Sequence, residues 1–129
     1  MALVETVIDA SAALCYVRRE RGWENFPAYL PLGVMSVVNY AEVVQRLLRE
    51  NANGTARAQA LLDAGLRLAD ADHDAAVSAA ALEGATRRQG VSLADRFCLS
   101  LGIRRGLPVL TADRPWDDLG LPVEIKLLR

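Results

Sequence analysis

Four carboxylates occupy similar places in the sequence, each just after an apolar run or in the first turn of the helix expected to follow one. "TVIDASAAL" (6–14) carries Asp9, and "SVVNYAEVV" (36–44) carries Glu42. "GVSLADRFCLSLG" (90–102) carries Asp95, and "VLTADRPW" (109–116) carries Asp113. A charge that is buried or half-buried costs free energy unless it is paired or holds a metal ion. These acids therefore predict either a metal centre or a set of helix caps and turns.

Apolar, β-branched runs alternate with helical patterns along the chain, which is typical of an α/β fold. Short strands are expected at 4–8, 34–38, 66–70, 107–113 and 121–128. Helices are expected at 11–21, 23–30, 40–50, 55–64 and 73–90, and a further helix around Ala94, Phe97, Cys98 and Leu101. We expect a three-layer α/β/α sandwich with a short central parallel sheet. Because ligands bind at the carboxyl ends of parallel strands, the acids are expected to meet at one crevice.

Length and composition limit the class of protein. The chain has 129 residues, 52% of them hydrophobic and 24% charged, so we expect a single globular domain spanning 1–129. No apolar run approaches the roughly 20 residues of a membrane span. The first apolar stretch contains Glu5 and Asp9 and lacks the basic leader of a signal peptide, so we expect a cytoplasmic protein. Cys15 and Cys98 have no CxxC spacing and are expected to be buried thiols.

Helix capping is the ordinary explanation for most of the acids. Asn39 with Glu42, and Ser92 with Asp95, have the spacing of a capping box. Asp113 precedes an Arg-Pro pair and suits a turn or a helix cap. Capping alone, however, does not require the acids to converge at one edge of a sheet.

Clustered carboxylates with no lysine or histidine among them repel one another unless they share protons or hold a divalent cation. Ligands that are all oxygen favour hard ions, so we expect Mg²⁺ or Mn²⁺. Such an ion supports hydrolysis of a phosphodiester by a metal-activated water. This chemistry needs no separate general base, and the only histidine, His73, is expected to be a surface or capping residue.

The segments "VIDASAAL", "NYAEVV", "SLADRFCLSLG" and "LTADRPW" resemble, in order and spacing, the acidic motifs of PIN domains, and most closely those of VapC-type toxin ribonucleases. The resemblance covers essentially the whole chain. It implies that Asp9, Glu42, Asp95 and Asp113 are the catalytic, metal-binding acids. It also implies an endoribonuclease that acts on RNA as the toxin of a type II toxin–antitoxin pair, bound by a small antitoxin and assembled as a homodimer.

The same resemblance assigns three auxiliary residues. Ser11 and Thr111 match family positions that hydrogen-bond the acids or the waters of the metal. Their ordinary alternatives are a helix N-cap and a strand residue. Asp117 falls where some members carry a fifth acid, and its alternative is a solvated acid in the "WDDLG" turn.

A nuclease with a net charge of −1 must concentrate positive charge near its site. Arg96 and Arg114 each follow one of the acids, and we expect one of them to contact a phosphate of the substrate. The alternative is an ion pair that balances the acidic cluster. Arg18, Arg19 and Arg21 either extend this basic track or occupy a favourable helix end.

Other classes fit less well. A phosphorelay receiver needs an acid pair after the first strand and a lysine after the last, and a haloacid-dehalogenase-type phosphatase needs an aspartate where this chain has Ser11. The alternative that remains is a non-catalytic RNA- or protein-binding module on the same fold. Loss of one acid would favour that alternative, and all four acids are present. The acids alone do not distinguish RNA from DNA.

Overall fold

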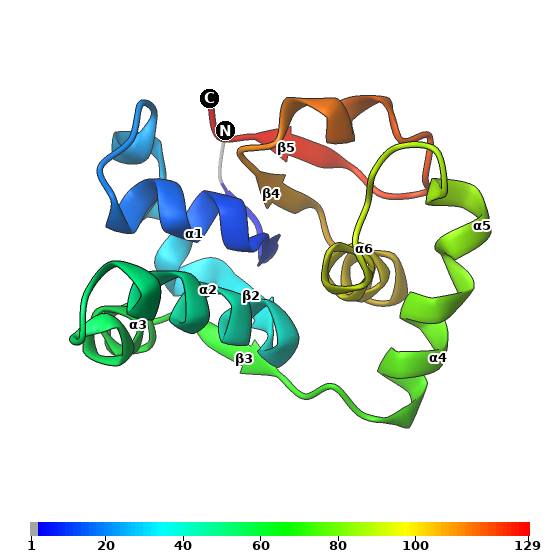
Figure 1. The fold of residues 1–129 in the computed structure, drawn as a ribbon. Coiled ribbons are helices and arrows are strands. Elements are labelled where there is room, and N and C mark those ends of the chain that lie inside the picture. The colour runs from blue at the N-terminus through cyan, green and yellow to red at the C-terminus, as the bar shows by residue number, and fades with distance from the viewer. Residues whose placement is uncertain (1–2) are drawn as a thin grey trace.

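A parallel sheet crosses the middle of the molecule in the computed structural model, which describes residues 3–129 (Figure 1). Its strands are β1 (Thr6–Ile8), β2 (Gly33–Ser36), β3 (Arg67–Ala69), β4 (Val109–Thr111) and β5 (Ile125–Leu127). The order is β3-β2-β1-β4-β5, and every neighbouring pair is parallel. The expected strands are confirmed, although each is shorter than the apolar run that predicts it.

Helices cover both faces of this sheet (Figure 1). One face carries α1 (Ala10–Val17), α2 (Val37–Glu50) and α3 (Gly54–Asp63). The other carries α6 (Leu93–Arg105), against which α4 (His73–Ala81) packs, and α5 (Glu83–Thr86) follows α4. The predicted three-layer α/β/α architecture is therefore confirmed.

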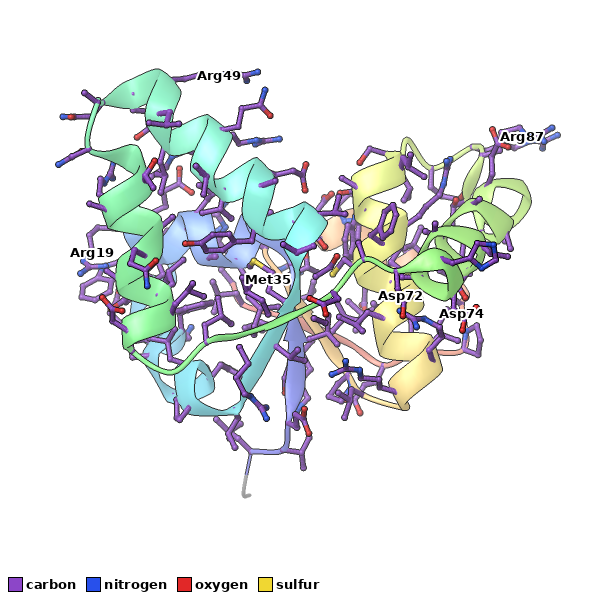
Figure 2. The ribbon with its side chains drawn as sticks, turned by 90° about the horizontal axis from the view of Figure 1, so that it is seen from below. Arg19, Met35, Arg49, Asp72, Asp74 and Arg87 are labelled. Carbon is purple, nitrogen blue, oxygen red and sulfur yellow. The ribbon has the colours of Figure 1, made fainter. Side chains whose placement is uncertain are left out.

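Alternation along the strands builds the two halves of the core. Val7 packs in the cluster under α6, whereas the next residue, Ile8, packs in the cluster under α1 and α2. This follows from the pleat, which turns successive side chains to opposite faces. Met35 belongs to the α1–α2 cluster, and Figure 2 shows its side chain inside the molecule. Cys15 and Cys98 are buried and free, as expected.

The segment 11–30 differs from the prediction. Helix α1 ends at Val17, and Arg19 adopts a φ of 56°, in the left-handed region that reverses the chain. The helix expected at 23–30 is wrong: the structure has two 3₁₀ helices, η1 (Trp23–Asn25) and η2 (Pro27–Leu32). Pro27 and Pro31 lack the N–H that a continuous α-helix needs, which explains the short elements.

The helix expected at 73–90 is also wrong, because it is interrupted at Leu82. The Leu82 N–H bonds to the Ala79 carbonyl, and the Thr86 hydroxyl donates to the Leu82 carbonyl at 2.7 Å. The Leu82 carbonyl also accepts the Thr86 N–H at 3.1 Å, so the break lies at the Leu82 N–H, whose partner is three residues back rather than four.

Helix α2 begins earlier than its apolar stripe predicts. Ser36 caps it by accepting the Val38 N–H at 3.2 Å, so Asn39 lies inside the first turns rather than at the cap. The capping box expected between Asn39 and Glu42 is therefore absent. The Asn39 side chain is available for another contact.

The sheet order places a ligand crevice beside β1. The chain moves from β1 to β2 on one side, and β4 adds to the other side of β1, so the order reverses at this strand. Such a reversal opens a space at the carboxyl ends of the two central strands. No helix in residues 3–129 has the length and apolar character to cross a membrane.

Candidate functional site

A pocket of about 390 Å³ opens at the carboxyl ends of β1 and β4. Five carboxylates line it. Four are the expected acids, Asp9, Glu42, Asp95 and Asp113, which are far apart in the sequence, and the fifth is Glu20, which no motif in the sequence indicates. The acids expected at the strand–helix junctions therefore line the same pocket.

Asp9 lies at the centre of this pocket, between the end of β1 and the start of α1, and its residue is only 3% exposed. Burial raises its pKa from 3.8 to about 6. Hydrogen bonds from Ser11 and Thr111 lower the pKa in part, whereas the charges of Asp95 and Glu42 raise it further. Asp9 therefore ionises at a cost that an added positive charge would offset.

Ser11 and Thr111 hold Asp9 in place. The Ser11 hydroxyl donates to Asp9 Oδ2 at 2.5 Å, and the Thr111 hydroxyl donates to the same oxygen at 2.8 Å. Both contacts are to Oδ2, so Oδ1 remains available to a ligand in the pocket. Ser11 Oγ also accepts the Ala112 N–H at 2.9 Å, and Thr111 Oγ1 accepts the Asp113 N–H at 3.0 Å. The hydroxyls thereby tie the turn after β4 to the end of β1.

Glu42 projects from α2 and is held by its own helix. Asn39 Nδ2 donates to Glu42 Oε1 at 3.1 Å and to the Ala94 carbonyl at 2.9 Å. Ala94 precedes Asp95, so one buried amide links the two helices that carry acids. Asn39 is fully buried, and its Oδ1 has no hydrogen-bond partner among residues 3–129. The spacing of Asn39 and Glu42 in the sequence predicts only a helix cap for Asn39.

Asp95 serves as the third residue of a capping box, as the ordinary explanation predicts. The Ser92 N–H donates to Asp95 Oδ2 at 2.9 Å, and the Asp95 N–H donates to Ser92 Oγ at 3.1 Å. Asp95 also lines the pocket, so capping and a role in the site coexist. The buried thiol of Cys98, one turn after Asp95, lies near the same acids. Burial raises the pKa of Cys98 well above its usual value, and the charges of Asp9, Asp95 and Glu42 raise it further.

Asp113 and Asp117 differ in position. Asp113 is exposed at the pocket rim and makes no side-chain cap at the start of η3 (Arg114–Asp118). Asp117 is exposed within η3 and does not line the pocket. Its placement is that of the solvated turn residue considered above.

The two arginines expected near a phosphate lie outside the pocket lining. Arg96 Nε donates to Thr86 Oγ1 at 3.0 Å, and Arg114 Nη1 donates to the Arg129 carbonyl at 2.9 Å. The arginines that line the pocket are Arg18, Arg46 and Arg129. Arg129 carries no motif signal, because only the folded arrangement brings the end of β5 beside α1.

Whether the residues present suit a metal ion depends on their chemistry and spacing. Within residues 3–129, no three His, Cys, Asp or Glu side chains lie close enough together to hold one ion as they stand. The donors that line the pocket are carboxylate oxygens with a serine hydroxyl nearby, and no nitrogen or sulfur ligand is among the lining residues. This oxygen-only set fits a hard divalent cation. The side chains of Glu42 and Asp113 are only partly buried or exposed, so they have room to adjust.

The fold is similar to several solved structures. DNA-bound VapBC from Salmonella typhimurium has a TM-score of 0.78 at 17% identity, covering 98% of this chain and 100% of that one. A toxin–antitoxin complex from Klebsiella pneumoniae has a TM-score of 0.75 at 16% identity, covering 96% and 98%. VapBC-5 from Mycobacterium tuberculosis has a TM-score of 0.60 at 21% identity, covering 96% and 97%.

Two comparisons of sequence complete the assignment. A search of curated protein sequences finds no match. A family model described as "PIN domain" matches residues 6–121. That match spans all four acids and every strand from β1 to β4. The chain therefore belongs to the PIN domain family.

Proposed function

We propose that this protein is a metal-dependent endoribonuclease that hydrolyses RNA phosphodiester bonds and is the toxin of a type II toxin–antitoxin pair. The proposal treats residues 1–129 as one nuclease domain. The observation that carries it is the convergence of Asp9, Glu42, Asp95 and Asp113 on one pocket, around an Asp9 whose pKa is raised to about 6. A merely structural acid is rarely kept in so costly an environment.

PIN-domain nucleases generally use divalent metal ions. In this chain Asp9, Glu42, Asp95 and Asp113 would hold the ion, and Mg²⁺ or Mn²⁺ fits their oxygen ligands. When bound, the ion supplies an activated water and offsets negative charge at the phosphate. Asp117 is proposed as an auxiliary acid only, since it lies outside the pocket lining.

Neighbouring side chains hold the acids of the pocket in fixed positions. Ser11 and Thr111 fix one oxygen of Asp9, so its carboxylate enters the pocket in a single orientation. The capping box holds Asp95 at the start of α6, and Asn39 steadies Glu42. Such fixed groups cost no reorganisation when charge develops at the phosphate.

The proposed protein partner of this chain comes from its similarity to the solved structures. The structures from Salmonella, Klebsiella and Mycobacterium are toxin–antitoxin assemblies, which supports a small antitoxin as partner of this chain. We further propose a homodimer that acts in the cytoplasm. The antitoxin and the homodimer rest on the family resemblance rather than on a contact in the structure, and the cytoplasmic location rests on the sequence pattern.

The deciding experiment is cleavage of an end-labelled RNA pool by antitoxin-free protein with Mg²⁺, with Mn²⁺ and with EDTA. Asp95→Asn is one test variant, but it also alters the capping box, so its fold must be checked by circular dichroism. Asp113→Asn is a cleaner variant, because Asp113 is exposed and makes no side-chain cap. Asp118→Asn is the matched control, an exposed acid of the 3₁₀ helix that follows Asp113, and it does not line the pocket.

Metal-dependent cuts that disappear in Asp95→Asn and Asp113→Asn, and persist in Asp118→Asn, are the expected result. Equal cutting by all proteins would contradict the assignment of the site. Absence of cutting with RNA binding retained would favour the non-catalytic binding module instead.

A further inference from the structure

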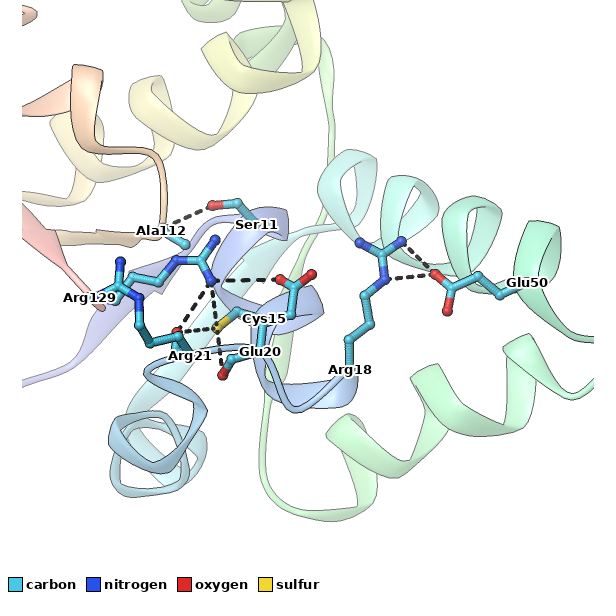
Figure 3. Close-up of polar contacts among 8 residues, drawn as sticks. All are labelled: Ser11, Cys15, Arg18, Glu20, Arg21, Glu50, Ala112 and Arg129. Atoms are coloured by element: carbon cyan, nitrogen blue, oxygen red, sulfur yellow. Dashed lines mark hydrogen bonds and ion pairs between the residues drawn. The ribbon is translucent and has the colours of Figure 1, made fainter.

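Arg129 is the pocket arginine whose guanidinium is held in place and still has one side free. The three arginines of the lining differ in how their guanidinium groups are used. Arg18 is occupied, because its Nε and Nη2 contact Glu50 Oε2 at 2.7 and 2.5 Å, an arrangement that Figure 3 shows. Arg46 is exposed on α2, with nothing in the described chain to fix it. A free, mobile arginine loses more entropy on binding than one that is already held.

Arg129 is held by only one of its nitrogens. Its Nη1 donates to the Arg21 carbonyl at 3.2 Å and contacts Cys15 Sγ at 3.9 Å (Figure 3). The same nitrogen lies 3.9 Å from Glu20 Oε1, a distance at which a half-exposed ion pair contributes little. Among residues 3–129, no acceptor contacts Nε or Nη2. The edge of the guanidinium that makes bidentate contacts is therefore open.

The backbone that carries Arg129 is anchored from several directions. Asn25 Nδ2 donates to the Leu128 carbonyl at 3.0 Å, and the Leu128 N–H donates to the Thr111 carbonyl at 2.8 Å. Arg114 Nη1 donates to the Arg129 carbonyl at 2.9 Å. Gly22, at a φ of 94°, passes so close that a Cβ there would lie 2.7 Å from Arg129 Cβ. These contacts fix the backbone of Arg129, and the Nη1 contacts hold its guanidinium beside α1.

We propose that Arg129 binds a phosphate of the RNA strand through its Nε–Nη2 edge, beside the carboxylates of the pocket. The inference rests on the proposed function and identifies the protein cation that faces the substrate backbone. A planar guanidinium matches the two oxygens of a phosphodiester, and it offsets part of the repulsion between the strand and the acids. Arg114, expected from the sequence to contact phosphate, acts here as a positioning residue, since it holds the carbonyl of Arg129.

The test is binding of a fluorescein-labelled single-stranded RNA, measured by anisotropy at several KCl concentrations in Ca²⁺, with a gel to verify that the strand stays intact. Arg129→Gln removes the positive charge. Arg129→Lys keeps the charge but lacks the paired N–H donors of the guanidinium. Arg87→Gln is the matched control, because Arg87 does not line the pocket and projects outward at the far end of the molecule (Figure 2). Thermal denaturation of each variant reports on the fold.

We expect Arg129→Gln to weaken binding about tenfold. The slope of log K against log salt should fall by roughly 0.7, the loss of one contact to a single strand. Arg129→Lys should keep the slope and recover only part of the affinity, and Arg87→Gln should match the wild type.

Other outcomes overturn the inference in distinguishable ways. If Arg129→Gln melts earlier yet keeps the affinity and the salt slope, Arg129 is a structural residue and the nuclease proposal is unaffected. If the wild-type protein itself neither binds nor cuts RNA, the proposed function fails and this inference fails with it.

Discussion

The Thr111 hydroxyl, on the last residue of β4, donates a 2.8 Å hydrogen bond to Asp9 Oδ2, just past the end of β1. This contact joins residues 102 positions apart across the two central strands. It links the register of the sheet to the orientation of the most buried carboxylate, because β1 and β4 are paired directly beneath it. The site is therefore built into the sheet rather than attached to a loop.

Thr111→Val tests this relationship with little change in volume. Hydrogen bonds from Ser11 and Thr111 lower the pKa of Asp9, so losing one of them should raise the pKa above its value of about 6. The measurement is a ¹³C carboxyl NMR titration of the metal-free protein. Thr55→Val, on the exposed side of α3, is the control and should leave the titration unchanged. An unchanged or lower Asp9 pKa in Thr111→Val would contradict the proposed contact.

Asp9→Asn should stabilise the metal-free protein at neutral pH. The pKa of Asp9 is raised from 3.8 to about 6, so between these values the folded state binds more protons than the unfolded state. The free energy of unfolding therefore falls as pH rises through this window, by about 3 kcal/mol in all. Asparagine stays neutral and escapes this loss.

Urea denaturation of wild type and Asp9→Asn at pH 4, 5, 6 and 7 measures the difference. The gap between the two proteins should widen as pH rises from about 4 to 6 and then stay constant. Added Mn²⁺ should stabilise the wild type and leave Asp9→Asn unchanged. A constant gap across the whole range would show that Asp9 titrates normally.

The sequence predicted the parts of the molecule that depend on local patterns. Short β-branched runs between helical stretches indicated the parallel sheet, and acids placed after strands indicated the crevice. The capping box of Ser92 and Asp95 was also readable, because its residues are neighbours in the chain. Each of these signals lies within one element or at one junction.

The rest depends on contacts between distant segments. Ser36, not Asn39, caps α2, and this leaves Asn39 to join Glu42 to the backbone of α6. Arg129 reaches the pocket because β5 ends beside α1, which no spacing in the sequence expresses. The break at Leu82 in the alanine-rich 73–90 stretch goes with a hydroxyl contact that helix propensity alone does not reveal.

Gly54 and Gly84 offer a matched pair for the packing that supports α2. A Cβ on Gly54 would lie 2.4 Å from the Leu48 nitrogen, at the end of α2, whereas a Cβ on Gly84 meets nothing within 4 Å. Gly54→Ala should lower the free energy of unfolding by roughly 1–3 kcal/mol, because backbone must shift. Gly84→Ala should be neutral or stabilising by about 0.5 kcal/mol. Similar urea midpoints for the two variants would show that α2 and α3 pack less closely than described.

Asn39→Ala should damage both stability and the site. Asn39 is fully buried and makes two side-chain hydrogen bonds, to Glu42 Oε1 and to the Ala94 carbonyl. Losing them should cost about 1–3 kcal/mol of unfolding free energy, since the Ala94 carbonyl keeps only its helical partner. Glu42 loses the donor that fixes one of its oxygens, so RNA cleavage should fall even at temperatures where the variant is folded.

The readout that separates these effects is metal affinity. Asn53→Ala is the control, an exposed asparagine whose side chain makes no cap at the start of α3. If Asn39 positions Glu42, Asn39→Ala should bind Mn²⁺ more weakly in a titration at low temperature, whereas Asn53→Ala should match the wild type. Reduced stability with unchanged Mn²⁺ affinity and cleavage would assign Asn39 to the joint between α2 and α6 alone.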